Sequence, residues 1–506
     1  MKKTQYFKQF TDEKTFSKLV RIKTMPLFME HIKKYGDKIG VVDEQEITYN
    51  QIYDDALALA FKLKENDINE KENVGVFAPN NYDFVKASLG TMAYGAVATL
   101  FPQQLNDTAL YYSMLKYNIK ALFYAKELEN VVELTKEKLP NIKFIKIENF
   151  EKKLTSFSSS IKTDDPACIV LTSGTTGKHK GAILSHKALL TGVWNGALGL
   201  KEPFDQVYVS LIPFTHVFGL IRNLLTGLYT GSKVYITPDM KQLFKTIKIA
   251  NPTILVLVPA LAEIFLKLSK EVGMGILGNN LKVVIAGGAH VSPYLTLEFN
   301  KLGIHFCPGY GLTESANLVS GNPEPTYKPR SIGKLYPNQQ YKIVNNELRI
   351  KGDNLMIKYY NDEEENKKAF DEEGYFRTGD LVHIDEEGFL YITGRIKEII
   401  VLPNGENVSP AYIENKINEL EEVQDSLVYD ETNENGVTIL VAELLPRQRA
   451  LAGKNIENLQ QFFEQKIDKV NKSLDSYEKI NKVVIRTEDF ARTPSLKIIR
   501  PERKKK

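Results

Sequence analysis

The sequence predicts an α/β protein with a large N-terminal domain followed by a small, mobile α+β C-terminal domain. Short apolar runs alternate with segments of helical periodicity from residue 39 to residue 286, which is typical of parallel sheets with crossover helices. The alternation occurs in two series, one on each side of a glycine-rich stretch at 171–186, so we predict two doubly wound parallel-sheet subdomains. Short strands and turns from about residue 331 predict a small β subdomain.

The first series combines short apolar strands with two helices. Apolar residues recur at helical spacing between Tyr49 and Asn66, and uniformly apolar runs flank this segment. The predicted strands are Ile39–Asp43, Glu46–Thr48, Val74–Phe77, Ala96–Phe101, Lys120–Phe123 and Phe144–Ile147, and the predicted helices are Tyr49–Asn66 and Asn81–Gly95.

The second series follows the glycine-rich stretch and ends in another glycine-containing turn. Its predicted strands are Val207–Ile212, Lys233–Ile236, Ile254–Val258 and Leu281–Ala286, and its predicted helices are Phe218–Tyr229, Met240–Ile249 and Ala260–Glu271. Gly287, Gly288 and Ala289 follow the last strand, and ligands bind at the carboxyl ends of strands in such sheets. We expect these residues to let a flat base or an acyl chain approach the backbone, with a tight turn as the alternative.

The remaining elements define the domain organisation. The predicted strands of the β subdomain are Tyr341–Val344, Glu347–Ile350, Leu381–Ile384 and Gly388–Thr393. We place the N-terminal domain at residues 1–395, with the β subdomain at about 331–394, and the C-terminal domain at residues 396–506.

The overall composition narrows the class of protein. With 66 basic and 63 acidic residues the formal net charge is +3, which offers no argument for a nucleic-acid partner. The two cysteines, Cys168 and Cys307, are too far apart in sequence for a metal motif and are expected to be reduced thiols. We expect no signal peptide and no transmembrane segment, and we predict a cytoplasmic location. The basic tail Pro501–Lys506 is interpreted as solvated, with weak attraction to a membrane surface as the alternative.

The glycine-rich stretch Leu171–His186 is the strongest chemical signal. Glycines, hydroxyl residues and lysines in one bend provide backbone N–H groups, side-chain donors and positive charge, which together suit a polyphosphate. A Walker A loop is disfavoured, because only Thr175 and Thr176 separate Gly174 from Gly177 and His179 follows Lys178. A solvated turn is the alternative.

Two further stretches carry residues suited to a nucleotide and its metal. In Pro308–Ser315, glycines on both sides of Tyr310 expose an aromatic face that suits adenine, and Thr313 suits a phosphate. Glu314 suits Mg²⁺, a hard cation that prefers carboxylate and phosphate oxygens. In Tyr375–Leu381, Asp380 suits the two ribose hydroxyls, with a plain turn as the alternative.

These stretches, together with Pro213–Leu220, Gly394–Glu398, Gly405–Glu414 and Arg492–Arg500, resemble the ordered motifs of the AMP-forming acyl-CoA synthetases, the adenylate-forming superfamily. The resemblance extends from about Ile47 to Lys497 and is closest to the long-chain fatty acid–CoA ligases. One departure is Asn346 where the family usually has glycine before Glu347 and Leu348, from which we expect a changed turn and intact chemistry.

The resemblance implies a role for each matching residue. It implies that Lys497, Glu314, Thr172 and His216 are catalytic, that Glu314 and Thr172 hold Mg²⁺, that Lys397 is the hinge between domains, and that His216 lies near the substrate carboxylate. It further implies that ATP, and then AMP, is bound by Thr172, Ser173, Gly174, Thr175, Thr176, Gly177, Lys178, Gly287, Gly288, Ala289, Pro308, Gly309, Tyr310, Gly311, Leu312, Thr313, Asp380, Arg395 and Lys497.

The implied reaction is activation of a carboxylic acid by ATP to acyl-AMP, followed by transfer to coenzyme A. The resemblance of Gly405–Glu414 and of Leu496 before Lys497 favours a fatty acid. Aryl acids, and an acyl carrier protein as the thiol, remain alternatives. Amino-acid activation is disfavoured because Pro213–Leu220 lacks an aspartate, and a non-catalytic nucleotide-binding protein is disfavoured because Lys497 and Glu314 are present. Oligomeric state and peripheral membrane contact stay open.

Overall fold

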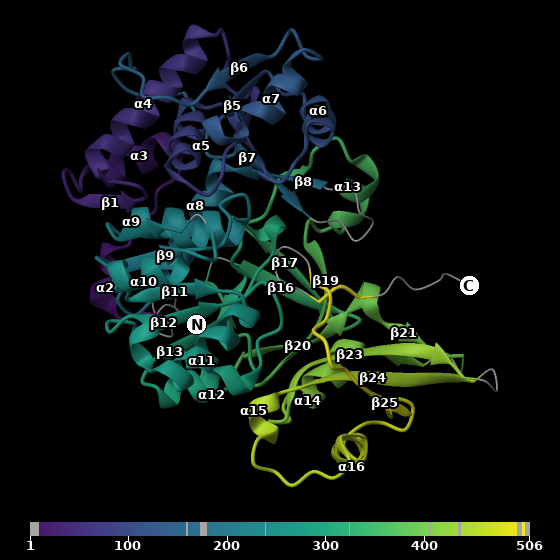
Figure 1. The fold of residues 1–506 in the computed structure, drawn as a ribbon. Helices are drawn as coiled ribbons and strands as arrows, with labels where there is room; N and C mark the ends of the chain where they lie inside the picture. The colour runs from purple at the N-terminus through teal and green to yellow at the C-terminus, as the bar shows by residue number, and fades with distance from the viewer. Residues whose placement is uncertain are drawn as a thin grey trace.

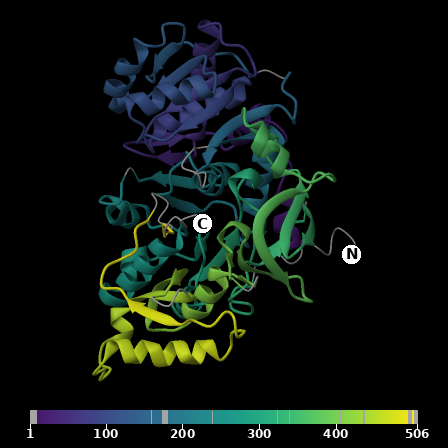
Figure 2. The same cartoon turned by 90° about the vertical axis from the view of Figure 1, so that its right-hand side faces the viewer.

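The computed structural model describes residues 10–157, 160–172, 180–237, 239–322, 324–337, 339–403, 406–433, 437–492 and 498–500. It confirms the predicted α/β fold. A 7-stranded sheet, a 9-stranded sheet and a small antiparallel sheet form the larger part of the molecule, and a separate C-terminal domain lies below them in Figures 1 and 2.

The 7-stranded sheet is parallel at its centre and antiparallel at one edge. Its order is β18-β8-β7-β4-β3-β5-β6, and β8 pairs antiparallel with both of its neighbours. The strands are β3 (Asn73–Phe77), β4 (Val97–Phe101), β5 (Ala121–Tyr124), β6 (Lys143–Lys146), β7 (Pro166–Thr172), β8 (Lys180–Ser185) and β18 (Lys358–Tyr359). The glycine-rich stretch is therefore not a loop throughout, as the sequence suggested, because its second part is strand β8 and its last residue begins a helix.

The 9-stranded sheet follows the second predicted series but also takes in two strands from the first. Its order is β15-β14-β13-β12-β11-β9-β10-β1-β2, with β9 to β13 and β1 parallel. The strands are β1 (Ile39–Val42), β2 (Glu46–Thr48), β9 (Val207–Ser210), β10 (Lys233–Ile236), β11 (Ile254–Leu257), β12 (Val283–Ala286), β13 (His305–Tyr310), β14 (Ser320–Gly321) and β15 (Lys334–Leu335). Grouping β1 and β2 with the first series was wrong, because β1 pairs with β10.

The helices pack between and around these two sheets, and several begin at a side-chain cap. Thr48 and Gln51 form a capping box at the start of α4, and Ser185 caps α8. The helices of this part are α2 (Glu13–Lys18), α3 (Met25–Lys33), α4 (Tyr49–Glu65), α5 (Tyr82–Tyr94), α6 (Asp107–Lys116), η1 (Lys126–Leu128), α7 (Glu129–Lys136), α8 (His186–Leu198), η2 (Phe218–Leu225, a π-helix), α9 (Thr226–Tyr229), α10 (Leu243–Ala250), α11 (Pro259–Val272), η3 (Met274–Leu277), α12 (Pro293–Lys301) and η4 (Thr313–Ser315).

The small β subdomain is a 4-stranded antiparallel sheet beside the 9-stranded sheet (Figure 2). Its strands are β16 (Gln339–Val344), β17 (Glu347–Gly352), β19 (Phe376–Ile384) and β20 (Leu390–Arg395), and helix α13 (Glu363–Ala369) precedes β19. Asn345 and Asn346 both have positive φ, the backbone conformation of a two-residue hairpin turn that asparagine tolerates. The departure at Asn346 thus suits the tight turn that brings Glu347 into the sheet.

The C-terminal domain has its own sheets and its own core. Its elements are η5 (Ile396–Glu398), β21 (Ile400–Val401), β22 (Asn407–Val408), α14 (Pro410–Ile417), β23 (Val423–Thr432), β24 (Thr438–Pro446), α15 (Gln448–Leu451), α16 (Leu459–Asn471) and β25 (Lys482–Ile485). Ile413, Val428 and Phe463 pack together in this core. The boundary at residue 395 stays a prediction.

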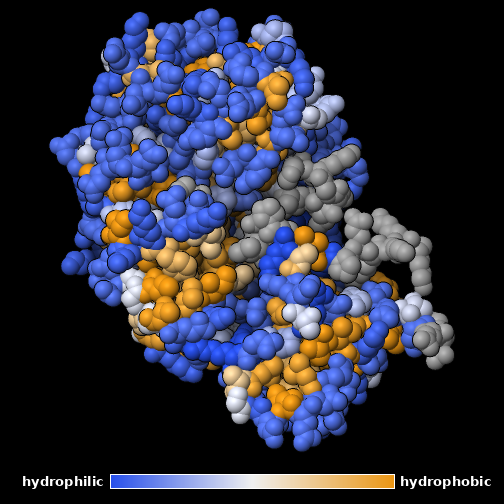
Figure 3. Space-filling view, in the orientation of Figure 1, coloured by the Kyte–Doolittle hydropathy of each residue, from blue (hydrophilic) through white to orange (hydrophobic). Residues whose placement is uncertain are grey.

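The surface carries exposed apolar side chains in more than one place. Figure 3 shows them gathered over the part of the molecule where Figure 1 places α10 and α11, and again over the C-terminal domain. Among the described residues, no helix combines the length and the apolar character that crossing a membrane requires. Peripheral membrane contact and a cytoplasmic location stay predictions. Cys168 and Cys307 are free thiols, as expected, and burial raises the pKa of each to about 12.

Direct contacts join the C-terminal domain to helices α11 and α12. Arg447 Nη2 lies 3.4 Å from a carboxylate oxygen of Glu263, and the Arg447 guanidinium stacks 4.4 Å from the ring centre of Tyr294. Burial raises the pKa of Glu263 to about 7, outweighing the attraction of Arg447. The packed arrangement therefore binds a proton that an exposed glutamate releases near its usual pKa of 4.5.

We expect the contact between the C-terminal domain and helix α11 to weaken as pH rises, because Glu263 then loses its proton. A carboxyl group whose pKa is raised on packing stabilises the packed state at low pH, and that stabilisation is lost between about pH 4.5 and pH 7. Glu263→Gln removes this titration. The melting temperature of the variant minus that of the wild type should increase from pH 5 to pH 8. Glu271→Gln, which changes an exposed carboxylate on the same helix, should give a constant difference. A constant difference for Glu263→Gln as well would contradict the expectation.

Candidate active site

The two ends of the glycine-rich stretch lie side by side in adjacent strands. Thr172 ends β7 and pairs with Lys180 at the start of β8. The Lys180 ammonium forms an ion pair with Glu365 of α13 and lies 5.3 Å from the ring centre of Tyr359. Ser173, Gly174, Thr175, Thr176, Gly177 and Lys178 lie outside the described residues, so their predicted contacts with phosphate stay predictions.

Glu314 is held against the same strands by Tyr359. The Tyr359 hydroxyl donates to Glu314 Oε1 at 2.7 Å, and the Met356 N–H donates to the Glu314 carbonyl at 2.7 Å. Tyr359 in turn pairs with Ala182 of β8. Burial and the neighbouring carboxylate hold the pKa of Tyr359 well above its usual value, so the hydroxyl keeps the proton that it donates. The carboxylate of Glu314 is thereby brought to the base of the glycine-rich stretch.

The predicted nucleotide-binding backbone comes from the carboxyl ends of two adjacent parallel strands. Ala286 of β12 pairs with Pro308 of β13, so the stretch Gly287–Ala289 lies next to the stretch Gly309–Thr313. A side chain at Gly311 would place Cβ 1.1 Å from the Asn317 carbonyl oxygen, so only glycine fits there. Gly288 has a φ of 82°, which also favours glycine. Both stretches thus expose backbone at one edge of the sheet.

Asp380 joins Tyr310 to Arg395. The Tyr310 hydroxyl donates to Asp380 Oδ2 at 2.5 Å, and Arg395 Nε lies 2.8 Å from Asp380 Oδ1. Asp380 is 1% exposed, and burial raises its pKa while Arg395 and the Tyr310 hydroxyl oppose that effect. Asp380 and Arg395 are paired residues of β19 and β20, so the ladder itself sets their separation.

The segment that contains His216 contacts residues of both large sheets or of the loops that follow their strands. It follows β9, and the neighbouring Phe214 N–H donates to Asn80 Oδ1 at 2.9 Å, a contact with the loop that follows β3. Two residues beyond His216, the Phe218 ring lies 3.6 Å from the position that a Cβ of Gly287 would take. The His216 segment therefore lies beside the exposed backbone at Gly287.

These contacts bring distant predicted residues to one place. Lys180, Tyr359 and Glu314 form one connected group, and Tyr310, Asp380 and Arg395 form a second that is joined to it through the stretch 310–314. Tyr359 and Glu365 were missed from the sequence. Strand β18, which holds Tyr359, has only two residues and no periodicity, and no motif marks Glu365 of α13.

Comparison with known proteins decides the family. The family of AMP-binding enzymes matches residues 28–360, and the C-terminal domain of AMP-binding enzymes matches residues 397–506. The chain belongs to the AMP-binding enzyme family. This confirms the resemblance to the AMP-forming acyl-CoA synthetases, and the chain is an AMP-forming acid–thiol ligase.

Relatives of this AMP-binding enzyme differ in the acid that their names state. A probable 4-coumarate–CoA ligase of Dictyostelium discoideum is 27% identical over 443 residues, covering 77% of this chain and 79% of that protein. A human long-chain-fatty-acid–CoA ligase is 26% identical over 484 residues, covering 77% and 66%. The crystal structure of an anthranilate CoA ligase with anthranoyl-AMP matches with a TM-score of 0.81 at 20% identity, covering 95% and 96% of the two chains, which shows the shared fold.

The C-terminal domain of the enzyme carries two of the predicted residues. Lys397 is exposed on η5, and it contributes, after Lys180, to lowering the pKa of Glu365, so it lies within electrostatic range of the base of the glycine-rich stretch. Lys497 lies outside the described residues. On its C-terminal side, Arg500 makes a two-point ion pair with Glu414 at 2.8 and 2.5 Å and a further contact of 3.2 Å with Glu398. The roles of Lys397 and Lys497 stay predictions.

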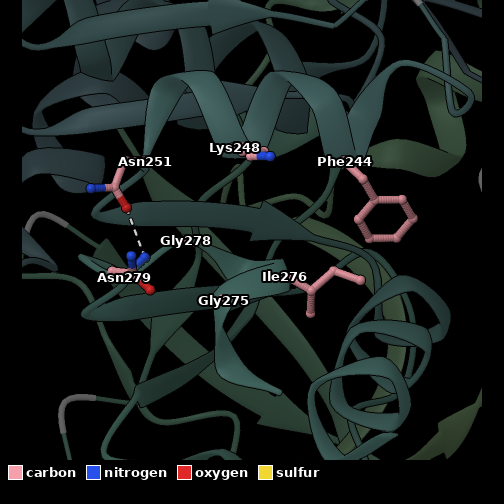
Figure 4. A pocket seen from close by; sticks show the side chains of 7 residues that line it. All are labelled: Phe244, Lys248, Asn251, Gly275, Ile276, Gly278 and Asn279. Carbon is pink, nitrogen blue, oxygen red and sulfur yellow. Dashed lines mark hydrogen bonds between the residues drawn. The ribbon is translucent and has the colours of Figure 1, made fainter. Parts of the chain in front are cut away.

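A pocket of about 520 Å³ lies away from these groups (Figure 4). Phe244 and Lys248 of α10 line one side of it, and Asn251, Gly278 and Asn279 precede the amino ends of β11 and β12. Since the predicted site residues follow the carboxyl ends of the same strands, this pocket is at the opposite edge of the sheet. We assign it no role in the reaction.

Proposed function

We propose that this ligase activates an aliphatic, fatty-acid-like carboxylic acid. The observation that carries the adenylation site is the connected set of contacts from Lys180 through Glu314 and Tyr310 to Asp380. This set joins the positions predicted to bind phosphate, metal, adenine and ribose. These positions come from segments between residues 180 and 380 of the sequence. The aliphatic acid is supported by the resemblance of Gly405–Glu414 to long-chain fatty acid–CoA ligases and by the human relative.

In the first half-reaction a carboxylate oxygen of the acid attacks the α-phosphorus of ATP. An O–P bond forms, the bond to pyrophosphate breaks, and pyrophosphate leaves with the electron pair. Catalysis of such a transfer consists mainly of positioning and charge stabilisation. Asp380 and Arg395 are suited to orienting the ribose, and the Gly287–Ala289 and Gly309–Thr313 backbones to receiving the adenine and the α-phosphate. Lys497 is suited to offsetting the repulsion between the carboxylate and the triphosphate.

The residues around Glu314 fit Mg²⁺ that arrives with ATP. Tyr359 occupies one oxygen of Glu314 and leaves the other available to a cation. Among the described residues, no three His, Cys, Asp or Glu side chains cluster in a way that could hold a metal ion. Mg²⁺ commonly takes one or two carboxylates and completes its shell with phosphate oxygens and water. When bound by Glu314 and Thr172, it would supply positive charge to the phosphates.

In the second half-reaction the thiol of coenzyme A attacks the acyl carbon of acyl-AMP. A C–S bond forms, AMP leaves, and the thiol proton passes to solvent or to a base. The segment that contains His216 lies beside Gly287, so His216 is suited to a place near the activated carboxylate, and Lys397 is suited to the hinge role between the two half-reactions. An acyl carrier protein is the alternative thiol.

Acid-dependent release of pyrophosphate tests the proposed substrate class. The full-length enzyme with Mg·ATP and coenzyme A is assayed against straight-chain acids of graded length and against aryl acids such as 4-coumarate. We expect the highest kcat/KM for a straight-chain acid. An aryl acid that exceeds every straight-chain acid would replace the proposed substrate class with the second candidate, which the Dictyostelium relative favours. Absence of acid-dependent turnover with every acid would overturn the adenylation site itself.

A further inference from the structure

A buried arginine without a carboxylate partner lies behind the candidate adenylation site. Arg222 on η2 is 3% exposed, and its guanidinium donates to the Gly196 carbonyl in the last turn of α8. Among the described residues no carboxylate lies within ion-pair distance of it. A guanidinium stays charged in a protein, and a buried charge is costly unless it is paired. Within the described part of the chain, nothing neutralises this interior positive charge.

The guanidinium is one wall of a small cavity. The cavity, about 30 Å³, is lined by Arg222 together with Ile285, Cys307, Gly309 and Tyr336. About 10–15 Å³ is enough for one water molecule, so the space suits a small polar group. The Phe10 ring, which also lines the cavity, stacks on Tyr336 with ring centres 4.9 Å apart.

The other polar groups of the wall do not supply a negative charge. Burial raises the pKa of Cys307 and of Tyr336 to about 12 each, so both stay neutral at physiological pH. Asn223 on η2, the helix of Arg222, and Asn195 on α8, which Arg222 contacts, are completely buried, and among the described residues their side-chain amides have no hydrogen-bond partner. Buried polar groups that lack partners in a native fold call for a ligand or water.

The cavity lies near the expected binding path of the carboxylic acid substrate. Gly309 lines the cavity and also belongs to the stretch expected to bind the nucleotide. Phe218 contacts the Gly287 position, and Arg222 lies one helical turn further along the same helix. An acid whose carboxylate is activated beside His216, and whose chain passes Phe218, would bring its far end to Arg222.

We infer that Arg222 determines substrate specificity by binding a second carboxylate at the far end of the acid, so that the preferred substrate is an aliphatic α,ω-dicarboxylic acid. This inference rests on the proposed function. The alternative is a structural role in which Arg222 only caps the last turn of α8, where carbonyl groups lack helical partners. Capping explains the contact with Gly196 but leaves the charged wall of the cavity without a function.

Matched substrates separate the two roles. Pyrophosphate release is measured for straight-chain dicarboxylic acids, for their monomethyl esters and for monocarboxylic acids of equal length. We expect the wild type to favour its best dicarboxylic acid over the monomethyl ester of that acid by about a hundredfold or more in kcat/KM, because the ester leaves a buried donor unpaired. Arg222→Met should remove this preference and improve the relative rate with monocarboxylic acids, and Arg222→Lys should retain part of it.

The outcomes distinguish failure of the inference about Arg222 from failure of the proposed function. If the wild type prefers monocarboxylic acids, or if Arg222→Met lowers the rates with all acids in equal proportion, Arg222 is structural and the inference falls while the proposed function stands. If no acid of any series supports pyrophosphate release, the proposed function falls and the inference falls with it. Should both variants fail to fold, the ratio of the wild-type kcat/KM values for the dicarboxylic acid and its monomethyl ester still decides between the two roles of Arg222.

Discussion

Lys497→Ala is expected to lower acid-dependent ATP–pyrophosphate exchange by about a hundredfold to a thousandfold while thioester formation from supplied acyl-AMP persists. Loss of one preorganised positive group at a site of developing charge has an effect of this size. The role of Lys497 comes from the family motif Thr-Pro-x-x-Lys-x-x-Arg at 493–500. The contacts of Arg500 with Glu414 and Glu398 attach the end of this motif to the C-terminal domain.

The two half-reactions provide the internal control for this variant. Coenzyme A consumption from synthetic acyl-AMP should stay within a few-fold of the wild-type rate, which also reports that the variant is folded. Lys505→Ala, which removes a charge from the basic tail outside the motif, should change neither half-reaction. Unchanged pyrophosphate exchange in Lys497→Ala would show that this lysine has no part in adenylation.

Glu314→Gln is expected to lower adenylation by about a hundredfold and to raise the Mg²⁺ concentration needed for half-maximal rate. An amide keeps the shape of the side chain and removes the negative charge that a magnesium ion prefers. The rate of pyrophosphate exchange is measured against Mg²⁺ concentration at fixed ATP. The variant should regain part of its activity at high Mg²⁺, because a weakened site fills at higher concentration.

Tyr359→Phe is the matched control for the Glu314 variant. It removes the hydrogen bond of 2.7 Å that orients Glu314 and leaves the carboxylate charge in place. Loss of one such hydrogen bond is worth roughly 1–2 kcal/mol, so the expected decrease is about tenfold, with a smaller change in the Mg²⁺ requirement. Equal Mg²⁺ dependence for Glu314→Gln and wild type would rule out Glu314 as a metal ligand.

Much of the fold could be predicted because its elements are locally determined. The helix α4 begins at a capping box formed by Thr48 and Gln51, and strand β10 matches its predicted bounds, Lys233–Ile236. Periodicity marks such elements because buried faces require it. Strand β8 was missed because its glycine, lysine and serine residues resemble a loop, and only pairing with β7 and β18 makes it a strand.

The residues of the candidate site also fall into two groups, those that local motifs predicted and those that only the tertiary structure revealed. Asp380, Tyr310, Glu314 and Arg395 were predicted because each stands in a short motif of distinctive residue types, and the structure brings them together. Tyr359 and Arg222 were not predicted, because a tyrosine in a two-residue strand and an arginine in an apolar helix have no local pattern. Their surroundings come from other segments of the chain.

The sequence by itself predicted the candidate site residues that stand in motifs and most of the alternation of strands and helices, since both depend on residue type and short spacing. The tertiary structure alone decided that β1 and β2 complete the second sheet, that Tyr359 orients Glu314, and that Arg222 faces a cavity behind Gly309. These features depend on hydrogen-bond ladders and packing between residues up to about two hundred positions apart, and no local pattern in the chain records which distant surfaces will meet.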